Sequence, residues 1–320
     1  MDKNPTVTLT PYTDADRDEL LKLWARALPL DAITVDTLET RVLLDENFDS
    51  ETFLLARSGG TLCGFVLGMR AVRLPLGDAD PNGTRAWITA LGVHPTDRLA
   101  SVGATLLDAL EAKFRALGKT ECFVSTYPPG YFTPGVDRTA SAALLEFLRA
   151  RGYGETKQAL SMDSSIVLFK VPPAVEERET ALRSEGIEIR QYRRTDLLSF
   201  LRFLEATMPT DWVRVERANL KKIATGGFTE QQITVVTRGA EIIGYCQFEG
   251  SHFGPFGVSD RYQGRGIGTV LLARTLERMR TMGYHDAWVM WTDDAAAKVY
   301  GKFGFTQTRR FSILRKDLGA

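Results

Sequence analysis

Residues 252–268, HFGPFGVSDRYQGRGIG, have the composition and order of an anion-binding loop. An apolar run ends at Val258, a glycine-rich turn follows, and the apolar positions after the turn recur with helical spacing. This order of strand, glycine turn and helix brings bare backbone N–H groups together with the positive end of a helix dipole, which suits a pyrophosphate. Three residues of the turn lack a Cβ atom and let the backbone approach phosphates closely: Gly264, Gly266 and Gly268.

Three kinds of phosphate-binding loop can be compared with this turn. A Walker A loop ends in Gly-Lys-Ser/Thr, whereas this one reads Gly-Ile-Gly-Thr; a dinucleotide fingerprint needs G-x-G-x-x-G, whereas the glycines here fall as G-x-G-x-G. Residues 263–268 instead resemble the Q/R-x-x-G-x-G/A motif of the GNAT acyltransferases, which hold the pyrophosphate of acetyl-CoA. The resemblance implies acetyl-CoA as donor substrate and contacts from Gln263, Gly264, Arg265, Gly266, Ile267, Gly268 and Thr269. A glycine turn before a surface helix is the alternative explanation.

A second motif lies about thirty residues further on, at residues 288–305, WVMWTDDAAAKVYGKFGF. It resembles the GNAT pattern of a strand followed by N-x-x-A-x-x-x-Y-x-x-x-G-F, with Asp293 in place of the usual Asn, and with Ala296 and Tyr300 in register. The resemblance implies that Asp293 and Ala296 contact the cofactor and that Tyr300 is the general acid to the leaving thiolate. A phenol stays protonated at neutral pH and can donate. The alternative for Tyr300 is packing of its helix onto the sheet, and helix capping suffices to explain Asp293.

The strand before the glycine turn has its own predicted role. In the family the pantetheine arm pairs with this strand, so the backbone groups of Phe256 and Val258 are the candidates for that pairing. Pro255 cannot donate a ladder hydrogen bond, so the strand must be an edge, or be bulged or splayed at that point. Glu249 and His252 precede the cofactor strand and are the candidates for general base. Both could equally be surface residues at a turn.

The chain repeats itself weakly, which predicts two domains. Each half opens with a short strand and an amphipathic helix, continues with a hairpin-like pair and an apolar strand ending in Gly-Val, and finishes with late strands, at 164–171 and 311–316. Hairpin-linked strands with a few helices indicate an α+β class. The resemblance implies two GNAT-fold domains, each a mixed, mostly antiparallel sheet flanked by helices. We expect an N-terminal domain at 1–170, a linker or bridging helix at 171–186 and a catalytic domain at 187–320.

The first half carries a degenerate copy of the motifs. At residues 98–103 the loop keeps Arg98 and Gly103 but has Ser101 in place of the middle glycine, and Leu148 stands at the tyrosine position. These changes predict a domain that has lost acyl transfer and serves as scaffold, although acyl-CoA binding stays open. An insertion at 126–139 is rich in proline, glycine and aromatic residues. It could bind a polar acceptor, or pack on its own domain or on the linker.

Composition narrows the function classes. Lys+Arg and Asp+Glu balance at 40 each in 320 residues, so there is no electrostatic case for nucleic acid or an anionic membrane as the main partner. Three cysteines and three histidines are scattered without ligand spacing, which predicts buried thiols in a reducing cytoplasm and no metal site. The N-terminus lacks the apolar core of a signal peptide.

The leading functional hypothesis is an acetyl-CoA-dependent N-acetyltransferase acting on a small-molecule or protein amine. Two others stay open: a non-catalytic acyl-CoA-binding regulator, and an aminoacyl transferase of tandem GNAT-like fold. The Tyr300 match argues against the regulator. The clean loop at 263–268 and the balanced charge disfavour a charged-tRNA donor. The sequence leaves the acceptor open, and the protein could be a monomer or a homodimer.

Overall fold

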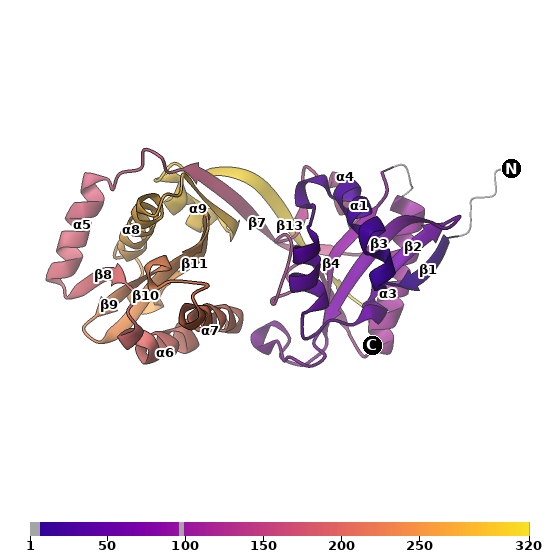
Figure 1. Cartoon of the computed structure of the whole chain (residues 1–320), viewed down its shortest axis with the longest axis horizontal. Coiled ribbons are helices and arrows are strands. Elements are labelled where there is room, and N and C mark those ends of the chain that lie inside the picture. The colour runs from indigo at the N-terminus through magenta and orange to yellow at the C-terminus, as the bar shows by residue number, and fades with distance from the viewer. Residues whose placement is uncertain (1–6, 96–98, 320) are drawn as a thin grey trace. The chain divides into compact units, whose positions relative to one another are not determined.

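The computed structural model of the chain describes residues 7–95 and 99–319. They form two compact units, of which unit 1 comprises Met1–Ala159 with Arg309–Ala320, and unit 2 comprises Leu160–Thr308 (Figure 1). Each unit has a mixed, mostly antiparallel sheet with helices on both faces, so the α+β class predicted from the sequence is confirmed. Among the described residues, each helix is either too short or too polar to cross a membrane.

Unit 1 is built on the strands β1 (Val7–Pro11), β2 (Phe53–Ser58), β3 (Thr61–Arg70), β4 (Arg85–Val93), β5 (Glu121–Val124) and β6 (Val136–Asp137). Its helices are α1 (Arg17–Ala27), α2 (Val35–Leu38), α3 (Ala104–Ala116) and α4 (Ala142–Ala150). Its short 3-10 and π turns are η1 (Asp14–Asp16), η2 (Pro29–Asp31), η3 (Glu39–Leu43), η4 (Ser50–Thr52), η5 (Gly77–Ala79) and η6 (Leu99–Gly103). The strand order is β1-β2-β3-β4-β5-β13, with β4 and β5 parallel.

Unit 2 repeats this plan with the strands β8 (Ile187–Gln191), β9 (Ile233–Arg238), β10 (Glu241–Glu249), β11 (His252–Val258) and β12 (Asp286–Thr292). Its helices are α5 (Pro173–Ser184), α6 (Leu197–Thr207), α7 (Thr210–Thr225), α8 (Ile267–Thr281) and α9 (Asp294–Gly301), with the short turns η7 (Arg194–Asp196), η8 (Glu230–Gln232) and η9 (Asp260–Tyr262). The strand order is β7-β12-β11-β10-β9-β8, with β11 and β12 parallel.

The last strand of each sequence half lies in the sheet of the other unit. Strand β7 (Gly154–Ser165) begins in unit 1, and its second part pairs with β12 of unit 2. Strand β13 (Thr306–Asp317) begins in unit 2, and its later part pairs with β5 of unit 1. The compact units therefore do not coincide with the sequence halves, and the segment expected as linker or bridging helix holds α5, which belongs to unit 2.

The predicted late strand at 164–171 is wrong, because β7 ends at Ser165. Its apolar residues instead pack into the core of unit 2. Ile166 is fully buried there, and Phe169 packs edge-on against Phe303 with ring centroids 6.0 Å apart. The strand predicted at 311–316 is confirmed within β13. The apolar run was therefore a core-filling segment, which local periodicity alone does not distinguish from a strand.

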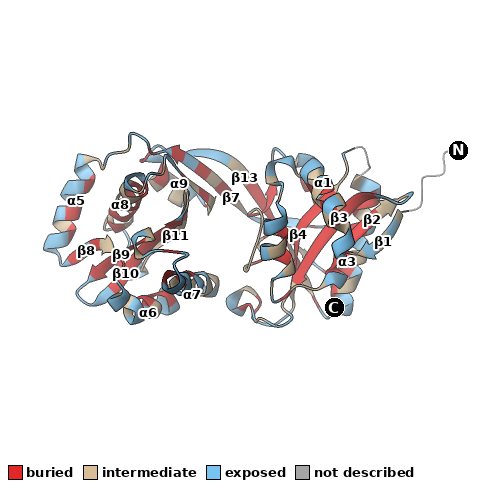
Figure 2. Ribbon diagram, in the orientation of Figure 1, coloured by how far each residue is buried: buried red, intermediate tan, exposed pale blue. Residues whose placement is uncertain are grey.

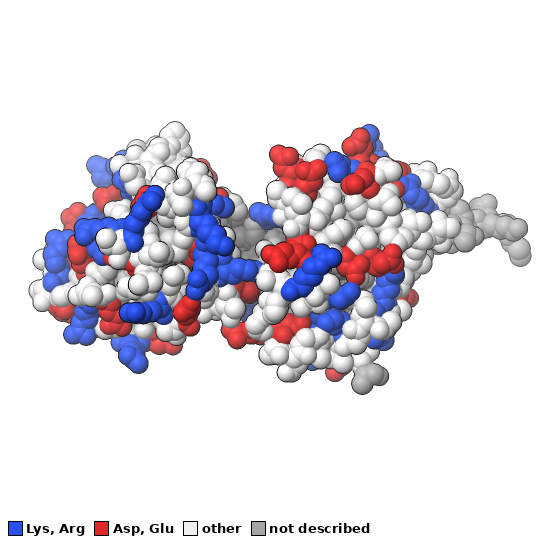
Figure 3. Space-filling model, turned by 60° about the horizontal axis from the view of Figure 1, so that its bottom comes forward, with Lys and Arg blue, Asp and Glu red and all other residues white. Residues whose placement is uncertain are grey.

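Burial is concentrated in the central strands of each unit (Figure 2). On one face of unit 1 the apolar side of α3 packs on β3, and the contact is close because Gly68 has no Cβ atom: one placed there would lie 2.6 Å from Phe114 Cζ. In unit 2 the helix α8 covers one face, while α6 and α7 cover the other through a separate cluster that includes Phe200 and Tyr245. Both basic and acidic side chains are exposed on the face drawn in Figure 3.

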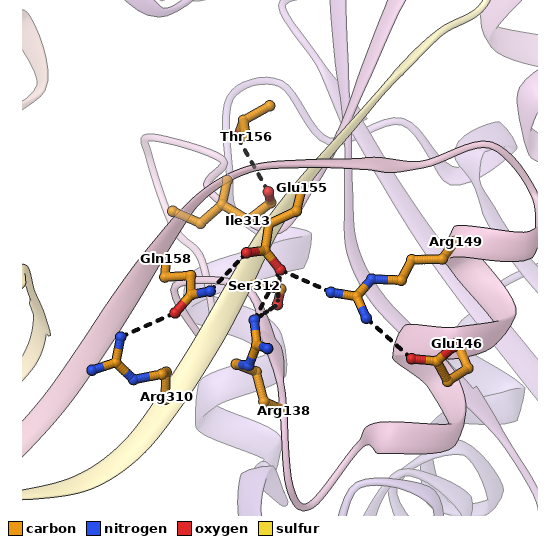
Figure 4. A network of polar contacts seen from close by, with 9 residues as sticks. All are labelled: Arg138, Glu146, Arg149, Glu155, Thr156, Gln158, Arg310, Ser312 and Ile313. Atoms are coloured by element: carbon orange, nitrogen blue, oxygen red, sulfur yellow. Dashed lines mark hydrogen bonds and ion pairs between the residues drawn. The ribbon is translucent and has the colours of Figure 1, made fainter.

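Arg309 ties β13 into unit 1. Its guanidinium donates to both carboxylate oxygens of Asp31, at 2.6 and 2.8 Å, and to Asp137 at 2.6 Å. The Asp137 side chain is 95% buried, and hydrogen bonds and charge from Arg309 outweigh burial and lower the pKa of that carboxyl. A second polar cluster, centred on Glu155, lies nearer the surface: Arg138 and Arg149 each donate to it at 3.0 Å (Figure 4).

We expect Arg309→Ala to lower the free energy of unfolding of unit 1 by about 3 kcal/mol, because it leaves a buried carboxylate without its cation. Arg149→Ala is the matched control and should cost less than about 1 kcal/mol, since its ion pairs are solvent-exposed. Urea unfolding of both variants measures the difference. Equal losses would show that the Arg309 contacts do not anchor β13.

Candidate active site

The strands β11 and β12 separate in the middle of the unit 2 sheet. They are paired at His252 and Trp288, where the Trp288 N–H donates to the Ser251 carbonyl at 2.9 Å, and no later pair joins them among the described residues. Parallel strands that start together and then diverge leave unpaired backbone groups along both inner edges. The gap opens toward the carboxyl ends of the two strands.

Strand β11 is also bulged on its other side, against β10. Cys246 pairs with Phe256 and Phe248 pairs with Phe253, so Gly254 and Pro255 together lie opposite the single intervening residue of β10. A β-bulge of this kind bends the strand and raises its twist. The prediction that Pro255 marks a bulged or splayed strand is confirmed.

A cleft of about 840 Å³ lies between the separated strands in unit 2. It is lined by the end of β11, the glycine turn, the start of α8, the end of β12, one face of α9, and the junction of α6 and α7. Most of the residues predicted to hold the cofactor lie on its wall, with the predicted acid: Phe256, Val258, Gln263, Gly264, Gly266, Ile267, Gly268, Thr269, Asp293, Ala296 and Tyr300. Such a volume is that of an ordinary small-molecule site.

The glycine turn has the backbone geometry that its sequence predicts. Gly264 and Gly266 have φ of 74° and 73°, in the left-handed region that glycine enters without strain, and Gly266 is the residue immediately before α8. The first N–H groups of a helix have no partner within it, so they face the cleft at the positive end of the α8 dipole. Gly268 fits close to β11, because a Cβ atom there would lie 3.3 Å from Phe256 Cζ.

Helix α5 holds this turn from outside the cleft. Arg178 Nε donates to the Arg265 carbonyl at 2.8 Å, and the Arg178 side chain lies 3.3 Å from where a Cβ of Gly266 would be. Glu185 forms ion pairs with both Arg178 and Arg265. Arg265 itself does not line the cleft. Sequence reasoning missed Arg178, because nothing in the charged run at 171–186 says which of its side chains reaches residues 264–266.

Tyr300 lies on α9 among aromatic side chains and is 5% exposed. Its ring meets Phe253 edge-on, with centroids 5.3 Å apart, and lies 6.3 Å from Phe256. Burial raises the pKa of Tyr300 to about 12, an effect that the neighbouring Thr292 hydroxyl partly offsets. The phenol therefore keeps its proton at neutral pH, and its role as general acid stays a prediction.

Asp293 has a capping role. Its carboxylate accepts from the N–H groups of Ala295 at 2.9 Å and Ala296 at 2.8 Å, which makes it the N-cap of α9. The capping explanation given by the sequence is confirmed, and the same residue lies on the cleft wall. A cofactor contact by its side chain stays a prediction.

The two candidate general bases do not lie on the cleft wall. Glu249 is exposed at the end of β10 and pairs with Lys222 at 3.4 Å. His252 packs on the Trp288 ring, with centroids 4.4 Å apart, at the end of β11 where the strands are still paired. The structure therefore does not bring Glu249 or His252 together with the residues that line the cleft.

The corresponding region of unit 1 is filled by its own chain. The inserted loop packs inward: Tyr127 is fully buried, donates to Asp45 at 2.8 Å and accepts from Asn47 at 3.1 Å, and Phe132 meets Trp24 edge-on. A cavity of only about 50 Å³ remains beside β4 and β5. The insertion thus packs on its own domain, one of the two roles predicted for it.

The degenerate motifs of the first half also fit a filled cleft. Leu148, at the tyrosine position, is fully buried in the core. Residues Leu99–Gly103 form the π-helical turn η6 in place of an open glycine turn, whereas Arg98 lies outside the described residues. Among the described residues, no group of three or more His, Cys, Asp or Glu side chains could hold a metal ion, and the three cysteines are buried thiols.

Comparison with known proteins places both halves in one family. The model described as "Acetyltransferase (GNAT) family" matches residues 17–130, and the model described as "Acetyltransferase (GNAT) domain" matches residues 214–313. A sequence search of curated proteins found no significant match.

Solved structures with the same fold cover almost the whole chain. A "GCN5-related glucosamine N-acetyltransferase region" of a fungal multi-domain β-N-acetylglucosaminidase has a TM-score of 0.80 at 18% identity; the match covers 98% of this chain and 38% of that one. A GCN5-related N-acetyltransferase from Sphaerobacter thermophilus has a TM-score of 0.71 at 16% identity, covering 98% and 96%. A tandem GNAT protein from the clavulanic acid biosynthesis pathway has a TM-score of 0.64 at 16% identity, covering 98% and 99%.

These likenesses confirm the GNAT fold predicted for both halves. The sequence matches in the two halves and the match to a tandem GNAT structure over nearly the full length agree with each other. The chain therefore belongs to the GNAT acetyltransferase family, as a tandem protein with two GNAT domains.

Proposed function

We propose that unit 2 is an acetyl-CoA-dependent N-acetyltransferase that acetylates a primary amine. The observation that carries this proposal is a single cleft with an anion-binding turn at one end and a buried, protonated tyrosine on its wall. The turn fits a pyrophosphate, since Gly264 and Gly266 adopt left-handed φ and leave the backbone bare. The unpaired edge of β11 fits an extended arm that pairs as an added strand would.

In this proposal acetyl-CoA supplies the acetyl thioester, and the residues of unit 2 hold and protonate it. The neutral acceptor amine attacks the carbonyl carbon, a C–N bond forms as the nitrogen loses one proton to solvent, and the C–S bond breaks with its electron pair on sulfur. Tyr300 donates its proton to the sulfur and later regains one from solvent. Backbone N–H groups near Phe256 and Val258 are our candidates for stabilising the carbonyl oxygen as charge develops on it.

The difference between the two units supports the same proposal. Unit 1 keeps only a cavity of about 50 Å³, with Phe132 on its wall, and Leu148 cannot donate a proton. We therefore assign donor binding to unit 2 and a scaffold role to unit 1. A regulator that only binds acyl-CoA would have no use for an acid in the cleft, so Tyr300 favours transfer. A cytoplasmic location is proposed from cysteine usage alone.

The activity itself is tested by following release of the CoA thiol from acetyl-CoA in the presence of primary amines of different size and charge. We expect amine-dependent thiol release with acetylated amine formed in equal amount, as mass spectrometry would show. Binding of acetyl-CoA without transfer to any amine, peptide lysine included, would favour the regulator.

Gly266→Asp should weaken acetyl-CoA binding at least about 100-fold, which is ~2.7 kcal/mol. A Cβ atom at this position would lie 3.3 Å from Arg178, so the aspartate would displace the side chain that holds the turn, and the left-handed φ strains any side chain. The matched control is Gly239→Asp, a left-handed glycine in the turn between β9 and β10 with no atom near its Cβ position. Calorimetry should show normal affinity in the control; equal losses in both variants would refute the phosphate site.

Arg178→Ala should weaken acetyl-CoA binding about tenfold, because the turn loses a hydrogen bond to a charged group and a nearby positive charge. Arg183→Ala, an exposed arginine at the end of the same helix, is the control and should leave the dissociation constant unchanged. Identical affinities for all three proteins would mean that α5 plays no part in holding the turn.

Tyr300→Phe should lower the maximal rate about 100-fold and leave acetyl-CoA affinity nearly intact, since only the proton donor is removed. Tyr284→Phe changes a tyrosine of unit 2 that does not line the cleft and should have the wild-type rate. An unchanged rate in Tyr300→Phe would remove this residue from the chemistry and leave it a packing role.

A further inference from the structure

Strand β12 is irregular just before it ends at the cleft. Its register with β7 shifts between Val289 and Thr292, so that two residues of β12 lie opposite Ser161 alone. The Ser161 hydroxyl donates to the Met290 carbonyl at 2.6 Å, which ties this irregular stretch to the neighbouring strand. A β-bulge of this kind changes the direction of the side chains that follow it.

The bulge turns Thr292 toward the buried core of unit 2. Side chains alternate between the two faces of a strand, so strict alternation would place Thr292 on the face opposite to Val289. Ala287, Val289 and Thr292 are nevertheless all buried, whereas the two residues between Val289 and Thr292 are half-buried. Ala287 and Val289 belong to the core cluster that contains Tyr300. Thr292 therefore lies on the same face of the sheet as Tyr300.

The Thr292 hydroxyl has no structural use in the described part of the chain. The residue is 6% exposed, and its Oγ1 atom makes no hydrogen bond of ordinary geometry with any described residue. A buried hydroxyl without a partner destabilises a fold, so a valine, which has nearly the same shape, would serve packing better. The residue nevertheless lies on the cleft wall, as Tyr300 does.

The surroundings of Tyr300 oppose the loss of its proton. Its ring lies against Phe253 and Phe256 and within 5.9 Å of Phe305, measured between ring centroids. In the proposed function the phenol becomes a phenolate when it protonates the sulfur, and apolar surroundings destabilise a charged oxygen. The phenolate therefore needs a hydrogen-bond donor close to its oxygen.

The Thr292 hydroxyl is the neighbour that meets this need. Burial raises the pKa of Tyr300 to about 12, Cys246 of β10 and Asp293 act in the same direction, and among the described residues the Thr292 hydroxyl is the group that lowers it. The remaining charged residues on the cleft wall, Asp260 and Lys302, are exposed to solvent, which screens their charge. A hydroxyl rotates freely and can turn its proton toward a negative oxygen.

We propose that Thr292 is a positioning residue of the transfer reaction, whose hydroxyl donates a hydrogen bond to the Tyr300 oxygen while that oxygen carries the negative charge. As the C–S bond breaks, its electron pair takes the Tyr300 proton and an S–H bond forms. The phenolate oxygen then accepts from Thr292, which keeps its own proton, and solvent reprotonates Tyr300 as the thiol leaves. This inference rests on the proposed function.

The first test is kinetic. Thr292→Val should lower the maximal rate of acetyl transfer at least about tenfold and change the KM for acetyl-CoA less than about twofold, since the lost hydrogen bond forms only during transfer. Thr292→Ser keeps a hydroxyl and should recover most of the lost rate. A wild-type rate in Thr292→Val, or no recovery in Thr292→Ser, would overturn the inference.

Thr234→Val is the matched control for the kinetic test. Thr234 is also a buried strand residue of unit 2 whose hydroxyl makes no ordinary hydrogen bond with a described residue, and it does not line the cleft. We expect the wild-type rate in this variant. An equal loss of rate in Thr234→Val and Thr292→Val would show a general effect of losing a buried hydroxyl and would contradict the inference.

A second measurement does not depend on acetyl transfer. Difluorotyrosine incorporated at position 300 ionises at lower pH than tyrosine, and its phenolate can be followed by ultraviolet absorbance. We expect this phenol to ionise at higher pH in the Thr292→Val background, because the group that lowers its pKa is gone, and at an unchanged pH in the Thr234→Val background. The same ionisation pH with threonine and with valine at position 292 would overturn the inference.

The variants also separate this inference from the proposed function. A slow Tyr300→Phe together with a wild-type rate in Thr292→Val would contradict the inference alone. A wild-type rate in Tyr300→Phe would contradict the general-acid role in the proposed function, and the inference with it.

Discussion

The separation of β11 from β12 is the constraint on which the rest of unit 2 depends. Two parallel strands that part after one residue pair leave backbone donors and acceptors unsatisfied, which costs free energy unless another molecule pairs with them. The cleft, the bare glycine turn and the start of α8 all follow from this gap, because each borders the space it opens. The bulge at Gly254 and Pro255 bends β11 away and lets the gap persist.

The corresponding strands of unit 1 leave no such gap. There β4 and β5 pair over four residues, from Arg85 to Ile88 on β4, and the inserted loop fills the space beyond them. The two units also depend on each other's chain, since β7 completes the sheet of unit 2 and β13 that of unit 1. Because β7 begins in unit 1 and completes the sheet of unit 2, unit 1 has a structural role although it has no open cleft of its own.

Much of the cleft could be predicted from the sequence, because the glycines of the turn act through local backbone geometry and the resemblance to the GNAT motifs implied Tyr300. Pro255 likewise indicated a bulge, because proline has no backbone N–H to donate to a ladder hydrogen bond. Arg178 and Met208 could not be predicted, since they reach the glycine turn and the cleft from helices whose placement depends on tertiary packing. The sequence also could not predict that β7 and β13 join the sheet of the other unit, because a local pattern predicts a strand but not the sheet to which the strand belongs. Glu249 and His252 were predicted because they lie just before and at the start of β11, whereas the cleft lies at the other end of this strand.

The most direct test of this account is the stoichiometry of acetyl-CoA binding to the intact chain, measured by isothermal titration calorimetry. The account predicts one site per chain, because the cleft of unit 2 measures about 840 Å³ and the cavity beside β4 and β5 of unit 1 only about 50 Å³. Two sites would contradict the assignment of unit 1 as scaffold. No binding would contradict the donor assignment itself and direct attention to another acyl donor.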